Sequence, residues 1–296
     1  MRLDSVRELK NELVARPREA GVTPAPGGGV SLGIHPAGNG DFQLAVRVHE
    51  PGASVDGYVE AARGEADVRH IGPVRAFENT SRVRPLRIGW SIGEVDVTAG
   101  TLGCFVSVGG DARILSNNHV LANQDRARPG AAVVQPGTVD GGADPADRVG
   151  VLARAVGLSD TGTNTVDCAI ATVEVEFDAA TIAGLGTLSG ATLAPDQADR
   201  VAKLGRTTEL TRGQVTAFEL DGVTVQYDSG TLRFDNQVEV HGSAGPFSQG
   251  GDSGSLIVSD PGLDAVALLF AGNQEGVTYG NPFGAVLDAL GATLLV

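Results

Sequence analysis

Three residue types that together can activate a serine hydroxyl lie in three separate segments of this chain. Ser253 stands in Gly-Asp-Ser-Gly-Ser, His119 in Leu-Ser-Asn-Asn-His-Val, and Asp167 in Val-Asp-Cys-Ala-Ile. A serine hydroxyl is a poor nucleophile at neutral pH, so it needs a base to take its proton and a third group to hold that base in the right tautomer. The three residues therefore predict a triad that attacks a carbonyl carbon and forms an acyl-enzyme.

The order of these residues along the chain separates the folds that can carry such a triad. An α/β-hydrolase places its serine first, in a Gly-x-Ser-x-Gly turn, and the acid and the histidine follow. Here the order is His119, Asp167, Ser253, and Ser253 is followed by Gly254 and then Ser255. This order favours a double β-barrel.

The three segments, in this order and at separations that suit two barrels, resemble those of the chymotrypsin-fold (trypsin-like) serine peptidases. The resemblance covers roughly residues 97 to 296. It implies an all-β fold of two six-stranded antiparallel Greek-key β-barrels, with His119 and Asp167 in the first and Ser253 in the second. It also implies a serine endopeptidase that acts on polypeptides and needs neither a metal nor a cofactor. We expect its specificity to be narrow, because an unrestrained protease in the cytosol would damage its host.

The resemblance also assigns the residues that would hold the reacting peptide. The oxyanion hole is expected from the backbone N–H groups of Gly251 and Ser253. The substrate is expected to pair, as an added strand, with the edge Phe270-Ala271-Gly272. Phe247, six residues before the nucleophile, is expected at the base of the specificity pocket. Because no carboxylate stands there, we expect a small or medium apolar P1 residue and not Arg or Lys.

Asp252 is adjacent to the nucleophile and needs a partner. In secreted members of the family the equivalent aspartate is buried against a new N-terminal amine that proteolysis releases. The segment Arg87-Ile88-Gly89 resembles such a cleavage site, but Ile88 lies only 31 residues before His119, which is shorter than the family's spacing. We therefore expect a constitutively formed loop, in which the partner of Asp252 is not identified by the sequence.

The chain divides into an N-terminal α+β extension (residues 1–90), a first barrel (91–180) and a second barrel (181–296). In the extension, apolar residues at helical spacing predict an amphipathic helix within residues 1–20. The segments that follow predict two strands, a helix and a further strand: residues 30–35, 42–49, 55–63 and 67–74. The chymotrypsin fold needs no such module, so we expect the extension to cover the cleft or to build an oligomer.

Within the barrels, short apolar runs separated by turns position the triad. Residues 103–108 and 112–116 predict a hairpin whose second strand delivers His119 on the turn after it. Residues 129–148 are rich in Pro, Gly and Asp and predict an irregular loop. Asp167 is expected to open a strand, and a short helix over residues 282–290 is expected to close the chain.

Composition limits the partners of the protein. The net charge of −14 opposes binding to nucleic acids or anionic membranes, because both reward clustered Lys and Arg. The first ten residues are charged and lack an apolar run, and no segment approaches the roughly 20 apolar residues of a membrane span. We therefore expect a cytoplasmic protein without a signal peptide.

The chain has only two cysteines, Cys104 and Cys168. A secreted peptidase of this class usually carries more, paired as disulfides. In the relatives, a cysteine ahead of the histidine pairs with one just after it; Cys104 fits the first position, but Val120 occupies the second. Two alternatives stay open, namely two reduced buried thiols or a Cys104–Cys168 disulfide.

Two other functions are compatible with the same residues. The first is a protease-fold binding or scaffolding protein whose triad stays latent. The second is an esterase-like acyl hydrolase, since the same triad could serve ester hydrolysis.

Overall fold

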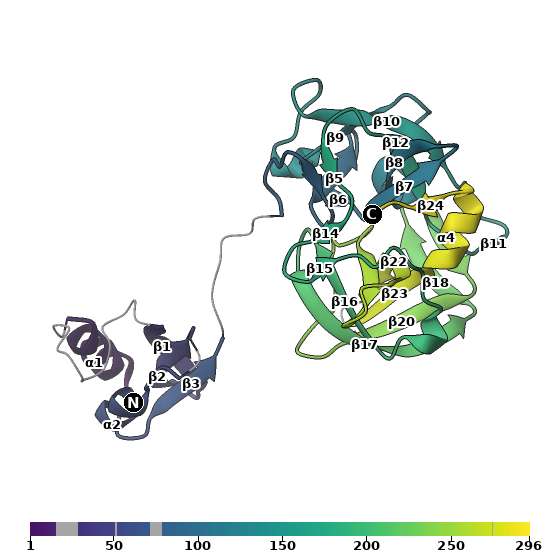
Figure 1. The fold of residues 1–296 in the computed structure, drawn as a ribbon. Helices are drawn as coiled ribbons and strands as arrows, with labels where there is room; N and C mark the ends of the chain where they lie inside the picture. The colour runs from purple at the N-terminus through teal and green to yellow at the C-terminus, as the bar shows by residue number, and fades with distance from the viewer. Residues whose placement is uncertain (16–28, 51, 72–78, 274) are drawn as a thin grey trace. The chain divides into compact units, whose positions relative to one another are not determined.

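The computed structural model describes residues 1–15, 29–50, 52–71, 79–273 and 275–296. It divides into two compact units, Met1–Ala76 and Phe77–Val296, each of which is described by itself (Figure 1). The first unit ends earlier than the boundary expected at residue 90. The reason is that Leu86, Ile88 and Trp90 are buried in the core of the larger unit.

The N-terminal unit is a small α+β module. Its elements are α1 (Leu3–Ala15), β1 (Val30–Gly38), β2 (Asp41–Val48), α2 (Asp56–Ala61) and β3 (Ala66–His70). The sheet order is β1-β2-β3, with β1 antiparallel and β3 parallel to β2. Apolar side chains from the helices and strands form a separate core: Leu13, Val30, Leu44, Val46, Tyr58 and Ala62. The order of elements is the one expected from the sequence.

The first half of the larger unit is built on one curled antiparallel sheet. Its elements are β4 (Leu86–Arg87), β5 (Ser91–Glu94), β6 (Gly100–Thr101), β7 (Cys104–Val108), β8 (Asp111–Ser116), α3 (Asn118–Leu121), β9 (Ala132–Val134), η1 (Thr138–Asp140), β10 (Arg148–Ala155), β11 (Thr163–Asn164) and β12 (Ala169–Thr172). The sheet has eight strands in the order β24-β7-β8-β12-β10-β9-β5-β6.

This sheet differs from the expected closed barrel of six strands. It is a half-barrel, and one of its strands, β24 (Thr293–Leu294), comes from the end of the chain and pairs with the edge of β7. The segment 129–148, expected to be irregular, contains β9 and η1. Val133 and Val134 on β9 are fully buried, which explains how a segment rich in Pro and Gly still contributes a strand.

The second half is a closed barrel of six strands, as expected. Its elements are β13 (Phe177–Asp178), β14 (Thr181–Ile182), β15 (Gly186–Thr187), η2 (Pro195–Gln197), β16 (Arg200–Gly205), β17 (Glu209–Leu220), β18 (Val223–Tyr227), β19 (Gly230–Phe234), β20 (Gln237–Gly242), β21 (Leu256–Ser259), β22 (Ala265–Gly272), β23 (Val277–Pro282) and α4 (Phe283–Leu290). The barrel order is β16-β17-β20-β23-β22-β21. Helix α4 confirms the helix expected near the end of the chain.

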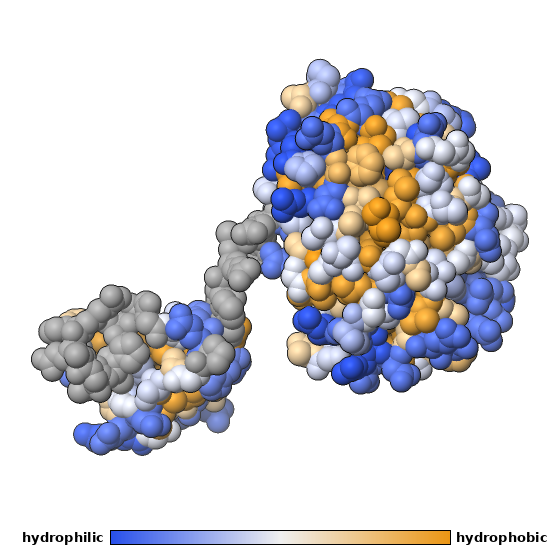
Figure 2. Space-filling model, in the orientation of Figure 1, coloured by the Kyte–Doolittle hydropathy of each residue, from blue (hydrophilic) through white to orange (hydrophobic). Residues whose placement is uncertain are grey.

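One apolar core joins the two halves of the larger unit. It includes Phe105 and Leu115 from the first half with Leu256, Leu268 and Phe283 from the second. On the face shown in Figure 2, apolar residues gather over the middle of this unit and hydrophilic side chains surround them. Among the described helices, none has the length and apolar character to cross a membrane. The shared core means that loops from both halves are supported by one rigid body.

Candidate active site

His119 and Asp167 are brought together by two neighbouring strands. Helix α3, which carries His119, follows β8 directly, and Asp167 stands just before β12. Strands β8 and β12 pair antiparallel with Ser116 opposite Ala169, so the two loops meet at the same end of the sheet. His119 Nδ1 lies 2.5 Å from Asp167 Oδ2. The orienting contact expected from the sequence is therefore present.

The Asp167 carboxylate is fully buried and accepts hydrogen bonds on both of its oxygens. Its Oδ1 accepts a hydrogen bond from the His119 backbone N–H at 3.3 Å, and its Oδ2 accepts one from the Tyr227 hydroxyl at 2.6 Å. Burial by itself would raise the pKa of Asp167, but the charge and hydrogen bonds of His119 and the hydrogen bond of Tyr227 outweigh it and lower that pKa. Asp167 is therefore held as a carboxylate.

Ser253 lies on the turn before β21 and lines the same cleft as His119. Its hydroxyl donates to the Phe270 carbonyl oxygen at 3.5 Å, which is long for an O–H···O hydrogen bond. Within the described residues, Ser253 Oγ makes no hydrogen bond to the His119 ring. His119 is thus oriented by Asp167, while the Ser253 hydroxyl contacts the Phe270 carbonyl oxygen and not the histidine ring.

Two carbonyl contacts fix the orientation of the peptide groups in the turn around Ser253. The Gly250 carbonyl accepts from Thr207 Oγ1 at 2.8 Å, and the Asp252 carbonyl accepts from Ser255 Oγ. Since C=O and N–H point in opposite directions in a trans peptide, these contacts turn the N–H groups of Gly251 and Ser253 the other way. In the described part of the chain, neither N–H donates to a protein group.

Glycine is required at position 251 for two reasons. Its φ is +98°, a conformation that residues with a side chain rarely adopt. A Cβ at this position would lie 2.5 Å from Thr207 Oγ1. The backbone conformation that exposes the Gly251 N–H is therefore tied to the absence of a side chain.

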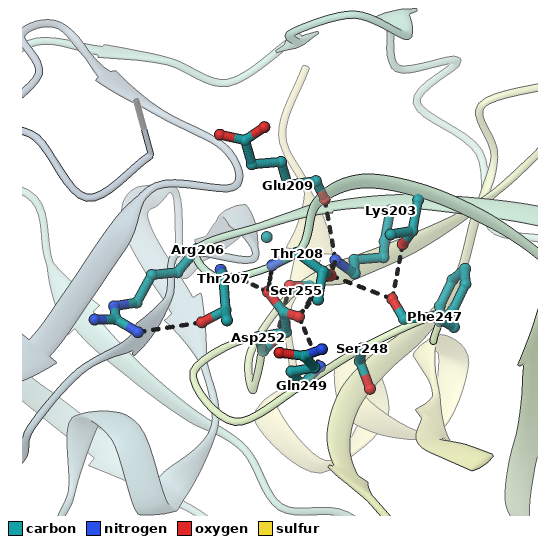
Figure 3. Close-up of polar contacts among 12 residues, drawn as sticks. Lys203, Arg206, Thr207, Thr208, Glu209, Phe247, Ser248, Gln249, Asp252 and Ser255 are labelled. Atoms are coloured by element: carbon teal, nitrogen blue, oxygen red, sulfur yellow. Dashed lines mark hydrogen bonds and ion pairs between the residues drawn. The ribbon is translucent and has the colours of Figure 1, made fainter. Parts of the chain in front are cut away.

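The partner of Asp252, which the sequence did not identify, is Lys203. The lysine Nζ lies 3.5 Å from Asp252 Oδ2, and both side chains are fully buried. The same carboxylate accepts hydrogen bonds from Thr208 Oγ1 at 2.7 Å and from the Gln249 N–H at 2.9 Å (Figure 3). The Thr207 N–H adds another at 2.8 Å. Asp252 thus anchors the turn that carries Ser253 to strand β16 without a free N-terminal amine.

Lys203 itself is enclosed by polar atoms. Its Nζ donates to the Glu209 carbonyl at 3.0 Å and to Thr208 Oγ1. Burial lowers the pKa of Lys203 to about 8, although the charge of Asp252 works in the opposite direction. The signal that could have revealed it was a lysine inside the apolar strand Val201–Leu204, in a chain that has only two lysines.

The cleft has a volume of about 640 Å³. Phe270, Ala271 and Gly272, expected to bind the substrate backbone, all line it. Phe247, expected at the base of the specificity pocket, does not line the cleft. Its side chain is fully buried in the core of the second barrel, and the adjacent Ser248 lines the cleft in its place.

The cleft carries little charge. Ser248 forms a hydrogen bond of 2.7 Å with the buried Thr278 hydroxyl, so hydroxyl groups occupy the place expected for Phe247. Among the described residues that line the cleft, Asp228 is the one Asp, Glu, Lys or Arg, and its carboxylate pairs with Arg126 at 3.0 Å. The described lining of the cleft is therefore mostly uncharged.

Cys104 and Cys168 are both buried and free in the structure, which decides between the two alternatives left open by the sequence. Burial raises the pKa of both thiols, so neither is reactive at neutral pH. No group of three or more His, Cys, Asp or Glu side chains in the described ranges could hold a metal ion.

Solved structures provide the comparison. Thermobifida fusca Protease A matches at 18% sequence identity and a TM-score of 0.50, over 71% of this chain and 100% of that chain. The Nocardiopsis protease NAPase matches at 20% identity and a TM-score of 0.50, again over 71% and 100%. The larger unit has the chymotrypsin-like serine protease fold. This fold places the loops after β8, before β12 and before β21 around one cleft. No protein-family model matches the sequence, and no curated protein matches it either.

Proposed function

We propose that the larger unit is a serine endopeptidase that uses His119, Asp167 and Ser253 as its catalytic triad. The observation that carries this proposal is the contact between the buried Asp167 carboxylate and His119, beside a cleft that both His119 and Ser253 line. A buried carboxylate that orients an imidazole beside a serine is what acyl transfer requires. Similarity to proteases in fold adds support but does not assign activity by itself.

In this mechanism the Ser253 hydroxyl turns from the Phe270 carbonyl toward His119 when a peptide fills the cleft. Ser253 Oγ attacks the scissile carbonyl carbon while His119 takes its proton. The N–H groups of Gly251 and Ser253 donate hydrogen bonds to the oxyanion. His119 then gives the proton to the leaving amine, the C–N bond breaks, and an acyl-enzyme remains. Water attacks the acyl-enzyme with His119 as base, which releases the acid and restores Ser253.

The substrate proposed for this cleft is an extended peptide that pairs with Phe270-Ala271-Gly272. The main-chain groups of this segment at the end of β22 would bind the peptide as an added strand. A small or medium apolar P1 residue remains our proposal, with Ser248 and Thr278 near its end where Phe247 was expected. Narrow specificity would follow from a cleft that offers few charged contacts.

One observation favours a second candidate, a binding or scaffolding protein with a latent triad. The Ser253 hydroxyl contacts the Phe270 carbonyl oxygen and not the histidine ring. Catalytic hydrogen bonds are often long without substrate, however, and form fully only in the complex. An esterase-like acyl hydrolase would use the same residues and would turn over small esters but not peptides.

The first experiment is intact-mass analysis after incubation with a fluorophosphonate. We expect one adduct on the wild-type protein, because an activated serine beside an oxyanion hole reacts with this reagent. Ser253→Ala should show none, while Ser255→Ala, the matched control on the adjacent buried hydroxyl, should keep reactivity if the turn stays folded. Absence of an adduct on wild type would favour the latent binding protein.

The N-terminal unit and the location of the protein are further parts of the proposal. We propose that the unit Met1–Ala76 regulates access to the cleft or builds an oligomer, because it has its own core and a triad does not need it. Two free buried thiols fit a reducing compartment, in agreement with the predicted cytoplasmic location.

A further inference from the structure

The hydroxyl that reaches the triad aspartate comes from an element that the sequence did not connect with the site. Tyr227 ends β18 in the hairpin β18–β19, far in sequence from Asp167. Its hydroxyl donates to Asp167 Oδ2 at 2.6 Å, the same oxygen that contacts His119 Nδ1. The Tyr227 side chain is only 7% exposed. One carboxylate oxygen therefore receives two hydrogen bonds, one from each half of the larger unit.

The aromatic ring of Tyr227 is held in place on two sides. It meets the His119 ring edge to face at 5.9 Å between centroids, and it stacks on Phe234 at 6.1 Å. Phe234 in turn packs against Phe270, which lines the cleft. The phenol is thus aimed at Asp167 by packing and not by the hydrogen bond alone.

The hairpin that carries Tyr227 is attached to the first half at both ends. Strand β19 pairs parallel with β11, which lies just before Asp167 in the chain. Asn164 on β11 donates to the Arg233 carbonyl at 3.1 Å. At the hairpin turn, Asp228 pairs with Arg126 at 3.0 Å. The position of the phenol relative to the triad is therefore set by contacts on either side of it.

The phenol stays a donor under all working conditions. Burial, together with the negative charge of Asp167, raises the pKa of Tyr227 well above its ordinary value. A protonated phenol next to an ionised carboxylate can only donate, and a charge-assisted hydrogen bond of this kind is among the strong ones. Part of the negative charge on Oδ2 is thus drawn away from the histidine.

We propose that Tyr227 is a positioning residue of the triad, whose hydroxyl fixes the rotamer of Asp167 and limits how strongly the carboxylate holds the proton on His119. This inference rests on the proposed function and deepens it. Val225, Gln226 and Asp228 of the same hairpin line the cleft, so one hairpin contacts the substrate and orients the aspartate.

The test is Tyr227→Phe, which removes the hydroxyl and keeps the ring. We expect kcat to fall about 10- to 100-fold with KM nearly unchanged, the range expected for a lost hydrogen bond to a charged group. The acid limb of the kcat/KM profile should move to higher pH, because a carboxylate with one donor fewer binds the imidazolium proton more strongly. Tyr279→Phe is the matched control, since Tyr279 packs against the same aromatic cluster without touching Asp167.

A double-mutant cycle separates positioning from simple packing. In the Asp167→Asn background, Tyr227→Phe should cost little more, because its partner charge is already gone. If Tyr227→Phe lowers kcat by the same factor with and without the aspartate, and the acid limb does not move, the phenol only fills space and the inference is overturned.

A readout without turnover keeps this test distinct from the proposed function. The proton between His119 Nδ1 and Asp167 should give a downfield proton NMR resonance, assigned by its loss in His119→Gln. Tyr227→Phe should shift that resonance further downfield, and Tyr279→Phe should leave it in place. A protein that reacts with no fluorophosphonate but shows this shift would refute the proposed activity and support the role of Tyr227. An unchanged resonance would overturn that role.

Discussion

Raising the pH above about 8 should switch off the active site by neutralising Lys203. Lys203 is the cation in contact with the buried Asp252, and Asp252 anchors the turn that presents Gly251 and Ser253. At 3.5 Å and an effective dielectric constant of 20, the attraction between the two charges is about 5 kcal/mol. This agrees with the 3 to 5 kcal/mol typical of breaking a buried ion pair. If half of that energy stabilises the ordered conformation of the turn, its loss would lower the ratio of ordered to disordered turn by about 50-fold.

The contribution of Lys203 to the free energy of unfolding should change with pH in the direction opposite to the activity. The pKa of Lys203 is about 8 in the folded protein, below the value of 10.5 for an unburied lysine. Between these two pH values the unfolded chain binds more protons than the folded chain, so the contribution of Lys203 to the free energy of unfolding rises with pH. Activity should therefore fall over this range while the contribution of Lys203 to stability does not. General alkaline unfolding would lower both.

The assay is kcat/KM against pH, or the rate of fluorophosphonate labelling where no substrate is known. Lys203→Arg keeps a positive charge at every pH in the range and should abolish the alkaline limb. Lys10→Arg is the matched control, because Lys10 is the other lysine in the chain. Lysine-selective NMR labelling would give two signals and report the pKa of Lys203 directly. A titration of Lys203 near 10.5, or an alkaline limb that persists in Lys203→Arg, would refute the reasoning.

Four further predictions can be checked by kinetics and by thermal unfolding. Asp167→Asn should lower kcat about 10⁴-fold because the imidazole is left in the wrong tautomer; near wild-type activity would assign the role of the acid to another carboxylate. Gly251→Ala should lower kcat more than it changes KM, since its Cβ would displace Thr207 and turn the Gly251 N–H; unchanged kcat would exclude this N–H from the oxyanion hole. A P1-varied peptide library should show cleavage after neutral residues, and dominant cleavage after Arg would contradict the predicted pocket. Deleting residues 1–76 should leave a folded larger unit with equal or higher activity, as measured by its melting temperature and labelling rate.

Local patterns in the sequence were enough to predict much of the fold and the site. The motifs around His119, Asp167 and Ser253 predicted that these residues lie close together. The structure brings His119 into contact with Asp167 and places Ser253 on the same cleft as His119, but Ser253 contacts the Phe270 carbonyl and not His119. The closing helix and the order of elements in the N-terminal unit were also predicted from the sequence. These features depend on residues close together in the chain, where residue type and spacing carry the signal.

Other features depended on contacts between distant segments. The first half of the larger unit follows the expected two-barrel architecture as a half-barrel, and β24 from the end of the chain adds a strand beside β7, which local patterns did not predict. Phe247 was expected in the cleft, but its direction is decided by packing in the barrel core, and its neighbour Ser248 faces the cleft.

The sequence by itself determined which residues could perform the chemistry, because the serine, histidine and aspartate, their order and their neighbouring residues can be recognised in three short segments. Only the tertiary structure decided what supports them. Lys203 reaches Asp252 across 49 positions, and Tyr227 reaches Asp167 across 60. The partner of a buried charge or hydroxyl is the polar group that the packing of the whole chain places within hydrogen-bond distance. Short segments of one sequence do not show which distant residues will lie that close.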